Sequence, residues 1–524
     1  MSDRERVVAA AAAGPDADMA TLASGGRLNM FGFGLRLAGR LPFLFIAGRV
    51  YGKGALGRFA FAVLTVEFAA QIASFGLRRG LAQLLADAKK PQACIVADAL
   101  ALAGVGSLIC IAILLTFPIA MYPDVHSPPH GLDKYLAVTV LAIAWTDISL
   151  AALAFNHDVA ATVRARSIVE PWTITIVAVV WTYISLEDGL IISYVFAMVA
   201  ALIAALIPLV RCYGLPRGWK PDLGGAWRTV VRNAPLAAAD TVEWASRRID
   251  LAVLGVFMSK EFVGVYYVAQ QVATLPAKLK TSFEPVLGPA IVRKIAANDR
   301  ASIADQVRQV TYWIIAAQLG IALALGIPGR AVMGLVGSDF TGGTAMLGFL
   351  LAAEVIAATA VVSESALIFL ARKRNMAISL IMLAVEAGLA ASLILFMRGE
   401  NLPPTFQATG PAIALCVALA FASIAKSWLL ARELAAPVSG WRWDLIWATG
   451  AGVAVGAPIR LFLPQAFQLL AVPVILVAFF TILWTKGFTP ADRALFTLRK
   501  HQVRELREAE DAAMARDQII DDLI

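Results

Sequence analysis

Long runs of apolar residues, each about as long as a membrane-spanning helix, recur along this 524-residue chain from residue 29 to residue 487. Hydrophobic residues make up 59% of the sequence and charged residues only 16%, whereas a soluble chain is about 45–50% apolar and about 25% charged. The runs therefore predict an all-α polytopic membrane protein. No part of the chain is left for a sizeable water-soluble domain, which argues against an enzyme with a separate catalytic domain.

Divided at about 20 residues per span, the runs predict about fourteen transmembrane helices. We place these helices at residues 29–50, 57–77, 92–118, 134–156, 163–184, 189–211, 234–257, 262–283, 309–333, 344–370, 374–397, 409–431, 443–463 and 466–486. An even number of spans puts both termini on the same side of the membrane.

Lysine and arginine residues are concentrated in every second loop between these spans. Such a bias is typical of cytoplasmic loops, so we predict a multi-pass protein of the bacterial inner membrane with both termini in the cytoplasm. The net charge of +8 lies in these short clusters and not on one polar domain. Nucleic acid is therefore not expected as a partner.

Two segments of the chain resemble each other, GRLPFLFIAGRVYGKGALGRFAFA from Gly39 and SRRIDLAVLGVFMSKEFVGVYYVA from Ser246. The matched pairs are Arg40 with Arg247, Gly48 with Gly255, Lys53 with Lys260, Gly57 with Gly264 and Ala62 with Ala269. A repeat after six helices keeps its orientation in the membrane. It predicts two pseudo-symmetric six-helix lobes that rock about a central cavity and expose it alternately to either side.

The repeat and the spans together predict how the chain is organised. The predicted parts are a disordered cytoplasmic N-terminal tail (1–28), an N-terminal six-helix lobe (29–211), a cytoplasmic linker (212–233), a C-terminal six-helix lobe (234–431), helices thirteen and fourteen (443–487) and a cytoplasmic C-terminal tail (488–524). The C-terminal tail has mixed charge at helical spacing, and both a solvated or interface-lying helix and a frayed polar tail stay open.

Helix seven, predicted at 234–257, carries an unusual number of ionisable residues. At 100° per residue, four of them fall within an arc of about 80°: Asp240, Glu243, Arg247 and Asp250. A charge in hydrocarbon is costly, so this stripe is expected to face water, a ligand or a partner helix. Buried carboxylates of this kind are candidates for taking up H⁺ or Na⁺, and we include Glu67, Asp240, Glu243, Asp250 and Glu354.

Arginines on helices one and seven are candidates for an anionic ligand. Arg36 and Arg40 lie about 40° apart on one helical face, and Arg40 and Arg247 are equivalent in the repeat. The guanidinium fork suits phosphate oxygens, so Arg36, Arg40, Arg247 and the adjacent Arg248 are predicted to bind substrate in the cavity. The alternative is internal salt bridging, for example of Arg247 with Glu243 or Asp250.

Motifs for nucleotide-driven or hydrolytic chemistry are not found in the sequence. It contains no GxxxxGK[ST], HExxH, GxSxG or complete GxGxxG pattern, so no cofactor is expected and energy should come from an ion gradient or from substrate flow. His126 and His130 have a spacing compatible with metal, but the intervening prolines preclude a regular helix, and no metal site is expected.

The opening passage GLRLAGRLPFLFIAGRVYGKGALGRFAFAVLTVEFAAQIASFGLRRGL, from Gly34, resembles the first helix pair of bacterial polysaccharide flippases. These form the lipid-linked oligosaccharide branch of the multidrug/oligosaccharidyl-lipid/polysaccharide exporter superfamily. The similarity is carried by the glycine, tyrosine and arginine pattern between Gly48 and Ala60, by the GLRRGL that ends helix two, and by the layout of the whole chain.

This resemblance implies a transporter and not an enzyme. Its cationic central cavity would carry an undecaprenyl-diphosphate-linked oligosaccharide from the cytoplasmic to the periplasmic leaflet by alternating access. Arg36, Arg40 and Arg247 would lie near the lipid diphosphate. The product would feed capsule, exopolysaccharide or O-antigen synthesis, with a polysaccharide polymerase and export machinery as further partners.

Three other functions stay open at this point. A lipid II flippase would have a similar layout and a cationic cavity. A multidrug exporter of the same superfamily would handle cations and would need an acidic cavity. A membrane glycosyltransferase or polymerase would need a large outward loop with catalytic residues, whereas the outward loops here are short.

Overall fold

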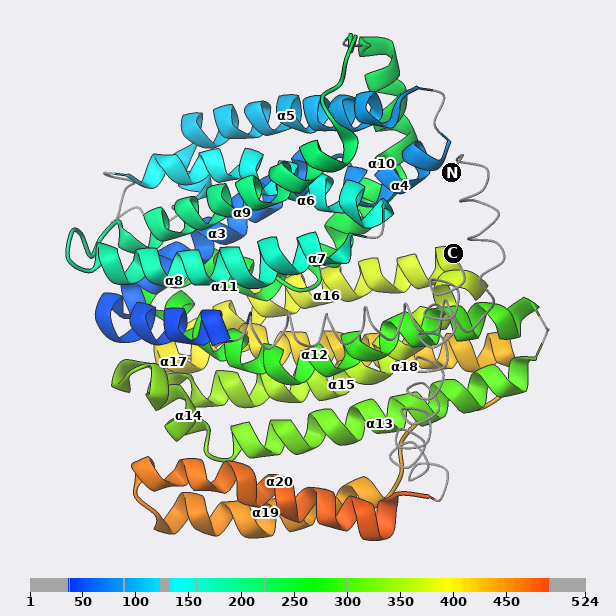
Figure 1. Ribbon diagram of the computed structural model, residues 1–524. Coiled ribbons are helices and arrows are strands. Elements are labelled where there is room, and N and C mark those ends of the chain that lie inside the picture. The colour runs from blue at the N-terminus through cyan, green and yellow to red at the C-terminus, as the bar shows by residue number, and fades with distance from the viewer. Residues whose placement is uncertain are drawn as a thin grey trace, which may run out of the picture. The chain divides into compact units, whose positions relative to one another are not determined.

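The computed structural model describes residues 36, 38–87, 90–122, 132–156, 158–220, 222–296 and 299–489. Within these ranges the chain forms helices and no strand (Figure 1). The predicted N-terminal tail, His126, His130 and the C-terminal tail beyond Thr489 lie outside the described residues.

Helices one and two are separated by a glycine and not by a loop. Residues 38–46 are helical, the π-helix η1 (Ala47–Tyr51) follows, and α3 (Gly52–Ala73) begins at once. Gly52 has φ +83°, a backbone conformation that interrupts a right-handed helix and that glycine adopts without strain. The next left-handed glycine, Gly76 with φ +69°, turns the chain into α4 (Leu77–Ala86).

The remaining elements follow the predicted spans. The first half continues with α5 (Gln92–Thr116), η2 (Pro118–Ala120), η3 (Asp133–Val138), α6 (Thr139–Phe155), α7 (Val159–Thr162), η4 (Val163–Val169), α8 (Glu170–Trp181) and α9 (Gly189–Tyr213). The second half contains α10 (Leu223–Ala245), α11 (Ile249–Phe257), α12 (Lys260–Ala296), α13 (Arg300–Gly326), α14 (Gly329–Val336), η5 (Ser338–Gly343), α15 (Thr344–Leu370), α16 (Arg372–Gly399), α17 (Pro404–Gln407) and α18 (Gly410–Leu434).

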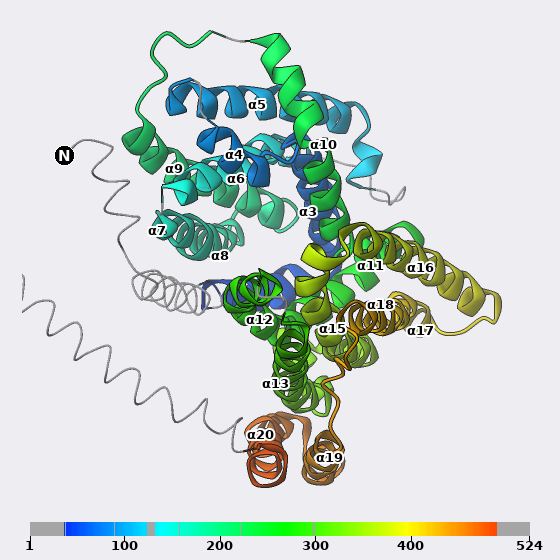
Figure 2. The ribbon, with the colours of Figure 1, turned by 90° about the vertical axis from the view of Figure 1, so that its right-hand side faces the viewer.

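The helix packing repeats between the two halves. In the first half α3 packs on α6, α6 on α9 and α8 on α9; in the second half α12 packs on α15, α15 on α18 and α16 on α18. In Figure 2, α5, α6, α8 and α9 lie together above α12, whereas α15 and α18 lie together to its right. The second half is joined by small residues, Ala360, Ala418 and Ala422, which let helices approach closely. The prediction of two pseudo-symmetric lobes is confirmed.

The contact between α3 and α12 shows the repeat at atomic detail. A Cβ on Gly57 would lie 1.7 Å from the Lys260 carbonyl oxygen, and a Cβ on Gly264 would lie 2.1 Å from the Lys53 carbonyl oxygen. In the sequence repeat, Gly57 is equivalent to Gly264 and Lys53 is equivalent to Lys260. Each glycine thus contacts the lysine of the opposite helix. Such reciprocity is what a local twofold relation between two elements requires.

Ten helices in the described ranges are long and apolar enough to cross a membrane. One of the ten, Ala38–Ala86, contains both of the first two predicted spans. The spans predicted at 163–184, 234–257 and 262–283 coincide with helices outside the ten, two of which are interrupted. The chain is a multi-pass membrane protein, and the number fourteen stays a prediction.

Helix seven differs from its prediction. It begins at Leu223, inside the predicted linker, where the Asp222 carboxylate accepts the Gly225 backbone N–H at 2.9 Å; this bond lowers the pKa of Asp222. The helix then breaks, because α10 ends at Ala245 and α11 begins at Ile249. The rotation of 100° per residue holds only within a continuous helix, so residues before and after the break do not share one helical face. The prediction of one continuous charged stripe is therefore wrong.

The chain divides into two compact units, and the second consists of Leu319–Pro328 and the residues from Trp441 onward. In this unit α19 (Asp444–Phe462) is followed by η6 (Gln465–Leu470), α20 (Ala471–Ile482) and η7 (Leu483–Gly487). α19 packs on α20, and Ala324 from the end of α13 shares a core with Ala471 and Ile475. Helices thirteen and fourteen thus form where the sequence predicts them.

Candidate substrate cavity

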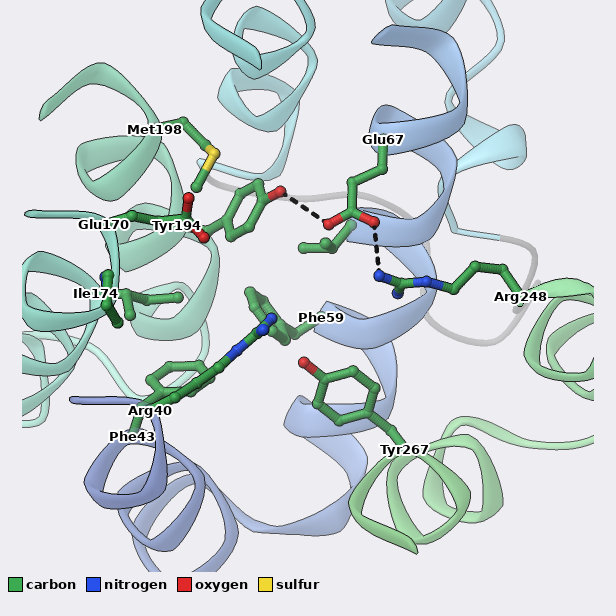
Figure 3. A pocket seen from close by; sticks show the side chains of 12 residues that line it. Arg40, Phe43, Phe59, Glu67, Glu170, Ile174, Tyr194, Met198, Arg248 and Tyr267 are labelled. Atoms are coloured by element: carbon green, nitrogen blue, oxygen red, sulfur yellow. Dashed lines mark hydrogen bonds and ion pairs between the residues drawn. The ribbon is translucent and has the colours of Figure 1, made fainter. Parts of the chain in front are cut away.

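A small cavity lies in the first unit, between the two lobes (Figure 3). Its walls come from the first helix, α3, α8 and α9 of one lobe, and from the α10–α11 break and α12 of the other. The lining residues are Arg40, Phe43, Phe59, Val63, Glu67, Glu170, Pro171, Ile174, Tyr194, Met198, Arg248 and Tyr267.

Arg40 enters the cavity from the first helix, which is fastened to α8. The Thr175 hydroxyl donates to the Gly39 carbonyl oxygen at 2.6 Å, and the Tyr51 hydroxyl donates to the Ala178 carbonyl oxygen at 2.7 Å. These bonds hold the two helices together on either side of Arg40. Figure 3 shows its guanidinium pointing towards the centre of the cavity, between Phe59 and Tyr267.

Arg248 enters from the opposite lobe, because it lies in the turn between α10 and α11. Its guanidinium forms an ion pair with Glu67 on α3 at 3.1 Å. The other Glu67 oxygen accepts the Tyr194 hydroxyl at 3.4 Å (Figure 3). Glu67 therefore connects the two lobes across the cavity.

Glu170, the first residue of α8, lies at the centre of a second group of charged side chains. Arg166 pairs with it at 2.9 Å and also with Asp147, while Arg36 lies 3.8 Å from its other oxygen. Around the cavity there are thus four arginines and three carboxylates: Arg36, Arg40, Arg166 and Arg248 with Glu67, Asp147 and Glu170.

Arg40 is the one of these four arginines that has no carboxylate within ion-pair distance among the described residues. Its neighbour in the cavity is the Tyr267 hydroxyl. The surplus positive charge of the cluster therefore lies on Arg40. An anionic group entering the cavity would find one unpaired guanidinium and a second, on Arg248, held by a carboxylate that it could replace.

Aromatic rings complete the wall beside Arg40. Phe59 packs edge-on against Phe43 at 5.7 Å, against Tyr194 at 5.8 Å and against Tyr267 at 6.4 Å between ring centroids. Interlocked rings of this kind keep their orientation. They present two hydroxyl groups, on Tyr194 and Tyr267, to the same space as the guanidinium groups.

Three predicted site residues line the cavity: Arg40, Arg248 and Glu67. A fourth, Arg36, lies behind it on Glu170. Arg247, which the repeat paired with Arg40, does not line the cavity. Its side chain is 62% exposed and pairs with Glu243 at 3.1 Å, so the alternative of internal salt bridging describes its position. The break at residues 246–248 is the reason, since it turns the following arginine inward instead.

The predicted carboxylates are distributed over different places. Asp240 is buried and pairs with Arg79 at 2.7 Å, and Glu243 also pairs with Arg79. Asp250 is buried next to Tyr266, whose hydroxyl donates to it at 2.7 Å. Glu354 is half-buried on α15 and is not among the lining residues. Of the five, only Glu67 reaches the cavity.

Sequence reasoning missed Arg166, Glu170 and the two tyrosines as site residues. Arg166 lies in η4, at the start of the span predicted at 163–184, with only 19% of its side chain exposed. The signal was present in part, because Arg166 and Glu170 have the i,i+4 spacing of a helical ion pair. Nothing local in the sequence distinguishes Tyr194 or Tyr267 from other tyrosines in apolar spans.

Comparison with known proteins finds a family that part of the chain is similar to. Residues 40–295 match the family model described as polysaccharide biosynthesis protein. The match covers 256 of the 524 residues. The matched residues include every residue that lines the cavity, from Arg40 to Tyr267. The match agrees with the resemblance drawn from the first helix pair.

The fold of this chain is shared with solved transporters. It is similar to the lipid II flippase MurJ in an inward closed conformation, with a TM-score of 0.67 and 12% identity over 87% of this chain and 97% of that chain. An inward-facing multidrug resistance MATE family transporter of the MOP superfamily has a TM-score of 0.61 and 11% identity over 76% and 94% of the two chains.

A MOP superfamily transporter from Pyrococcus furiosus gives a TM-score of 0.56 and 11% identity, over 79% of this chain and 95% of that chain. At these identities the similarity shows a common fold. These solved structures are transporters or flippases. No protein of curated function matches the chain in sequence.

Proposed function

We propose that this protein is a flippase that moves an undecaprenyl-diphosphate-linked oligosaccharide from the cytoplasmic to the periplasmic leaflet of the bacterial inner membrane. The product would serve capsule, exopolysaccharide or O-antigen synthesis. The observation that supports this proposal most is the pair Arg40 and Arg248, which converge from the two lobes on one cavity with the charge of Arg40 unpaired. A lipid diphosphate offers the oxygens that such a pair binds.

In the proposed binding step, Arg40 pairs with the diphosphate first. A second phosphate oxygen then replaces Glu67 on Arg248, which breaks the 3.1 Å ion pair between the lobes. Glu67 keeps the Tyr194 hydroxyl as its donor. When the cavity is empty, Glu67 holds Arg248 in place, so the site does not carry two unpaired cations in a low-dielectric environment.

Alternating access requires contacts between the lobes that separate in turn. At one end of α3, Arg49 Nε donates to the Leu335 carbonyl oxygen at 3.0 Å. Beyond the other end, α4 and α10 are joined by Arg79 with Asp240 and by Arg232 with Asp87. The Gly57–Gly264 contact lies between these two sets along α3 and is a suitable pivot.

The lipid II flippase is a second candidate, and the fold shared with MurJ favours keeping it. A test for an essential role in growth separates it from a polymer-specific flippase. The multidrug exporter is less suited to the cavity, because a cavity for cations should be acidic and this one has surplus arginine. A membrane glycosyltransferase would be supported by sugar transfer with the purified protein.

The proposal is tested with fluorescent undecaprenyl-diphosphate oligosaccharide in proteoliposomes. Arg40→Ala and Arg248→Ala should each slow translocation by about tenfold to a hundredfold, because each removes charge-assisted hydrogen bonds to the diphosphate. The matched control is Arg247→Ala, which changes the adjacent, exposed arginine outside the cavity. Inert wild-type protein, or cavity variants as fast as wild type, would overturn the proposal.

A further inference from the structure

A carboxylate on α16 lies in the second lobe without any hydrogen-bond partner in the described ranges. Glu386 is fully buried, and neither of its carboxylate oxygens accepts a bond there. The other buried acids among those residues have partners: Asp133 pairs with Arg58, Asp240 pairs with Arg79, and Asp250 accepts several donors. An ionised, unpartnered carboxylate is the most costly arrangement in such a place.

The neighbour that faces Glu386 is a second acid, Asp250. α11, which carries Asp250, packs directly on α16, and the Asp250 charge acts on Glu386. Asp250 accepts the Tyr266 hydroxyl and the Leu251 N–H at 2.7 Å each, and the Gln270 amide at 3.2 Å. Donors therefore favour the ionised form of Asp250, whereas nothing supports an ionised Glu386.

The surrounding charges do not change this picture. The titratable groups that act on Asp250 are Arg248 from the α10–α11 turn and Tyr266 from α12, and Cys416 from α18 acts on Tyr266. The other titratable residues on helices packed against α16 have interactions of their own: Glu364 with Lys426, Asp240 and Glu243 with Arg79, and Glu354 with a further partner. The short helix α17 carries no titratable residue.

We propose that Asp250 and Glu386 form a shared proton site that is loaded and emptied during transport. Two carboxylates in one buried environment cannot both be ionised at moderate cost, so the pair holds a proton. In the loading step an O–H bond forms between one carboxylate oxygen and a proton from water. In the unloading step this bond breaks and the proton returns to water, without any oxidation or reduction.

The arrangement suits a proton better than a metal cation. The Asp250 oxygens already accept three different donors, so few lone pairs remain for a metal ion. In the described part of the chain no group of three or more His, Cys, Asp or Glu residues could hold a metal ion. Glu386 alone would have to supply the remaining coordination.

The proton site is joined to the cavity through two short stretches of chain. Asp250 follows Arg248 by two residues, and Tyr266, which binds Asp250, precedes Tyr267, which lines the cavity. Loss of the proton leaves a second negative charge near Arg248, where it competes with Glu67 and with a bound anion. Emptying the proton site should therefore weaken the hold of Arg248 on the substrate, which is the coupling that a proton-driven flippase needs.

Infrared difference spectroscopy tests the proton site directly, on purified full-length protein in lipid nanodiscs. The difference between acid and alkaline pH should contain the C=O band of a buried, protonated carboxylic acid, shifted in heavy water. Glu386→Gln keeps the size of the side chain and should abolish this band. The control Glu187→Gln changes an exposed glutamate and should leave it. A band that persists in a folded Glu386→Gln protein would overturn the proposal.

A transport measurement tests the coupling and, unlike the infrared band, rests on the proposed function. In the proteoliposome assay an imposed pH gradient should accelerate wild-type translocation, and both Glu386→Gln and Asp250→Asn should lose this response. Acceleration by a sodium gradient and not by a pH gradient would overturn proton coupling. If wild type moves no lipid-linked oligosaccharide at all, the proposed function fails, while the infrared band still decides whether the proton site exists.

Discussion

Two of the contacts between the lobes differ in their chemistry. Between α3 and α12, Gly57 and Gly264 bring backbone against backbone, with no space for a Cβ on either side. Between α4 and α10, Arg79 pairs with Asp240 and Glu243, and Arg232 pairs with Asp87. One contact depends on shape alone, and the other depends on charge.

This difference suggests different tasks in a transport cycle. A backbone contact without side chains keeps its geometry while the lobes tilt about it, but it tolerates no added atoms. Ion pairs can separate and exchange their partners for water, and their strength decreases with exposure and salt. The glycine contact is therefore suited to a pivot and the charged contact to a gate that opens and closes.

Adding one methyl group at the pivot should have the largest effect. In Gly57→Ala the new Cβ would lie 1.7 Å from a backbone oxygen, so the two helices must separate. We expect a loss of about 1–3 kcal/mol in the free energy of unfolding and a loss of translocation. Thermal unfolding in detergent and the proteoliposome assay measure the two effects.

Gly54→Ala is the matched control on the same helix. Its Cβ would lie 3.5 Å from a Glu261 side-chain oxygen, which is ordinary contact, and alanine favours the helix by about 1 kcal/mol over glycine. This variant should be as stable as wild type or more stable. Equal destabilisation by both substitutions would show that the close contact of Gly57 has no special role.

Removing the central arginine of the charged contact should have an intermediate effect. Arg79→Ala leaves the buried carboxylate of Asp240 without its partner, and we expect this to shift the protein towards a state in which α4 and α10 separate. Spin labels at the exposed residues Gln83 and Trp227 measure the distance between these helices. Adding Asp240→Asn to Arg79→Ala should restore part of the wild-type distance distribution, because it removes the unpaired charge. An unchanged distribution in Arg79→Ala would exclude the gate.

The exposed pair of the same contact should have the smallest effect. Arg232 and Asp87 have side chains 50% and 63% exposed, and ion pairs of this kind contribute between zero and about 1 kcal/mol. Arg232→Ala should change the free energy of unfolding by less than about 0.5 kcal/mol, and the change should vanish in high salt. A larger, salt-resistant change would mean that the gate depends on this pair as well as on Arg79.

The site could be predicted from sequence only in part. Arg40 and Glu67 were identified because a charge in an apolar span is unusual whatever its surroundings. Arg247 and Arg248 were both predicted to bind substrate, and the turn at residues 246–248 brings only Arg248 to the cavity. The role of Glu170 depends on Arg36 and Arg166 arriving from two other segments, which no local pattern reports.

The amino-acid sequence by itself determined the membrane environment, the all-helical fold, the repeat and the family resemblance. These properties follow from the length of apolar runs and from local spacing, which are readable one segment at a time. The tertiary structure alone decided which arginines converge on the cavity and that Glu386 faces Asp250 across α11 and α16. Such convergence results from helix breaks and long-range packing, which place side chains from distant segments together and leave no trace in the spacing of any one of them.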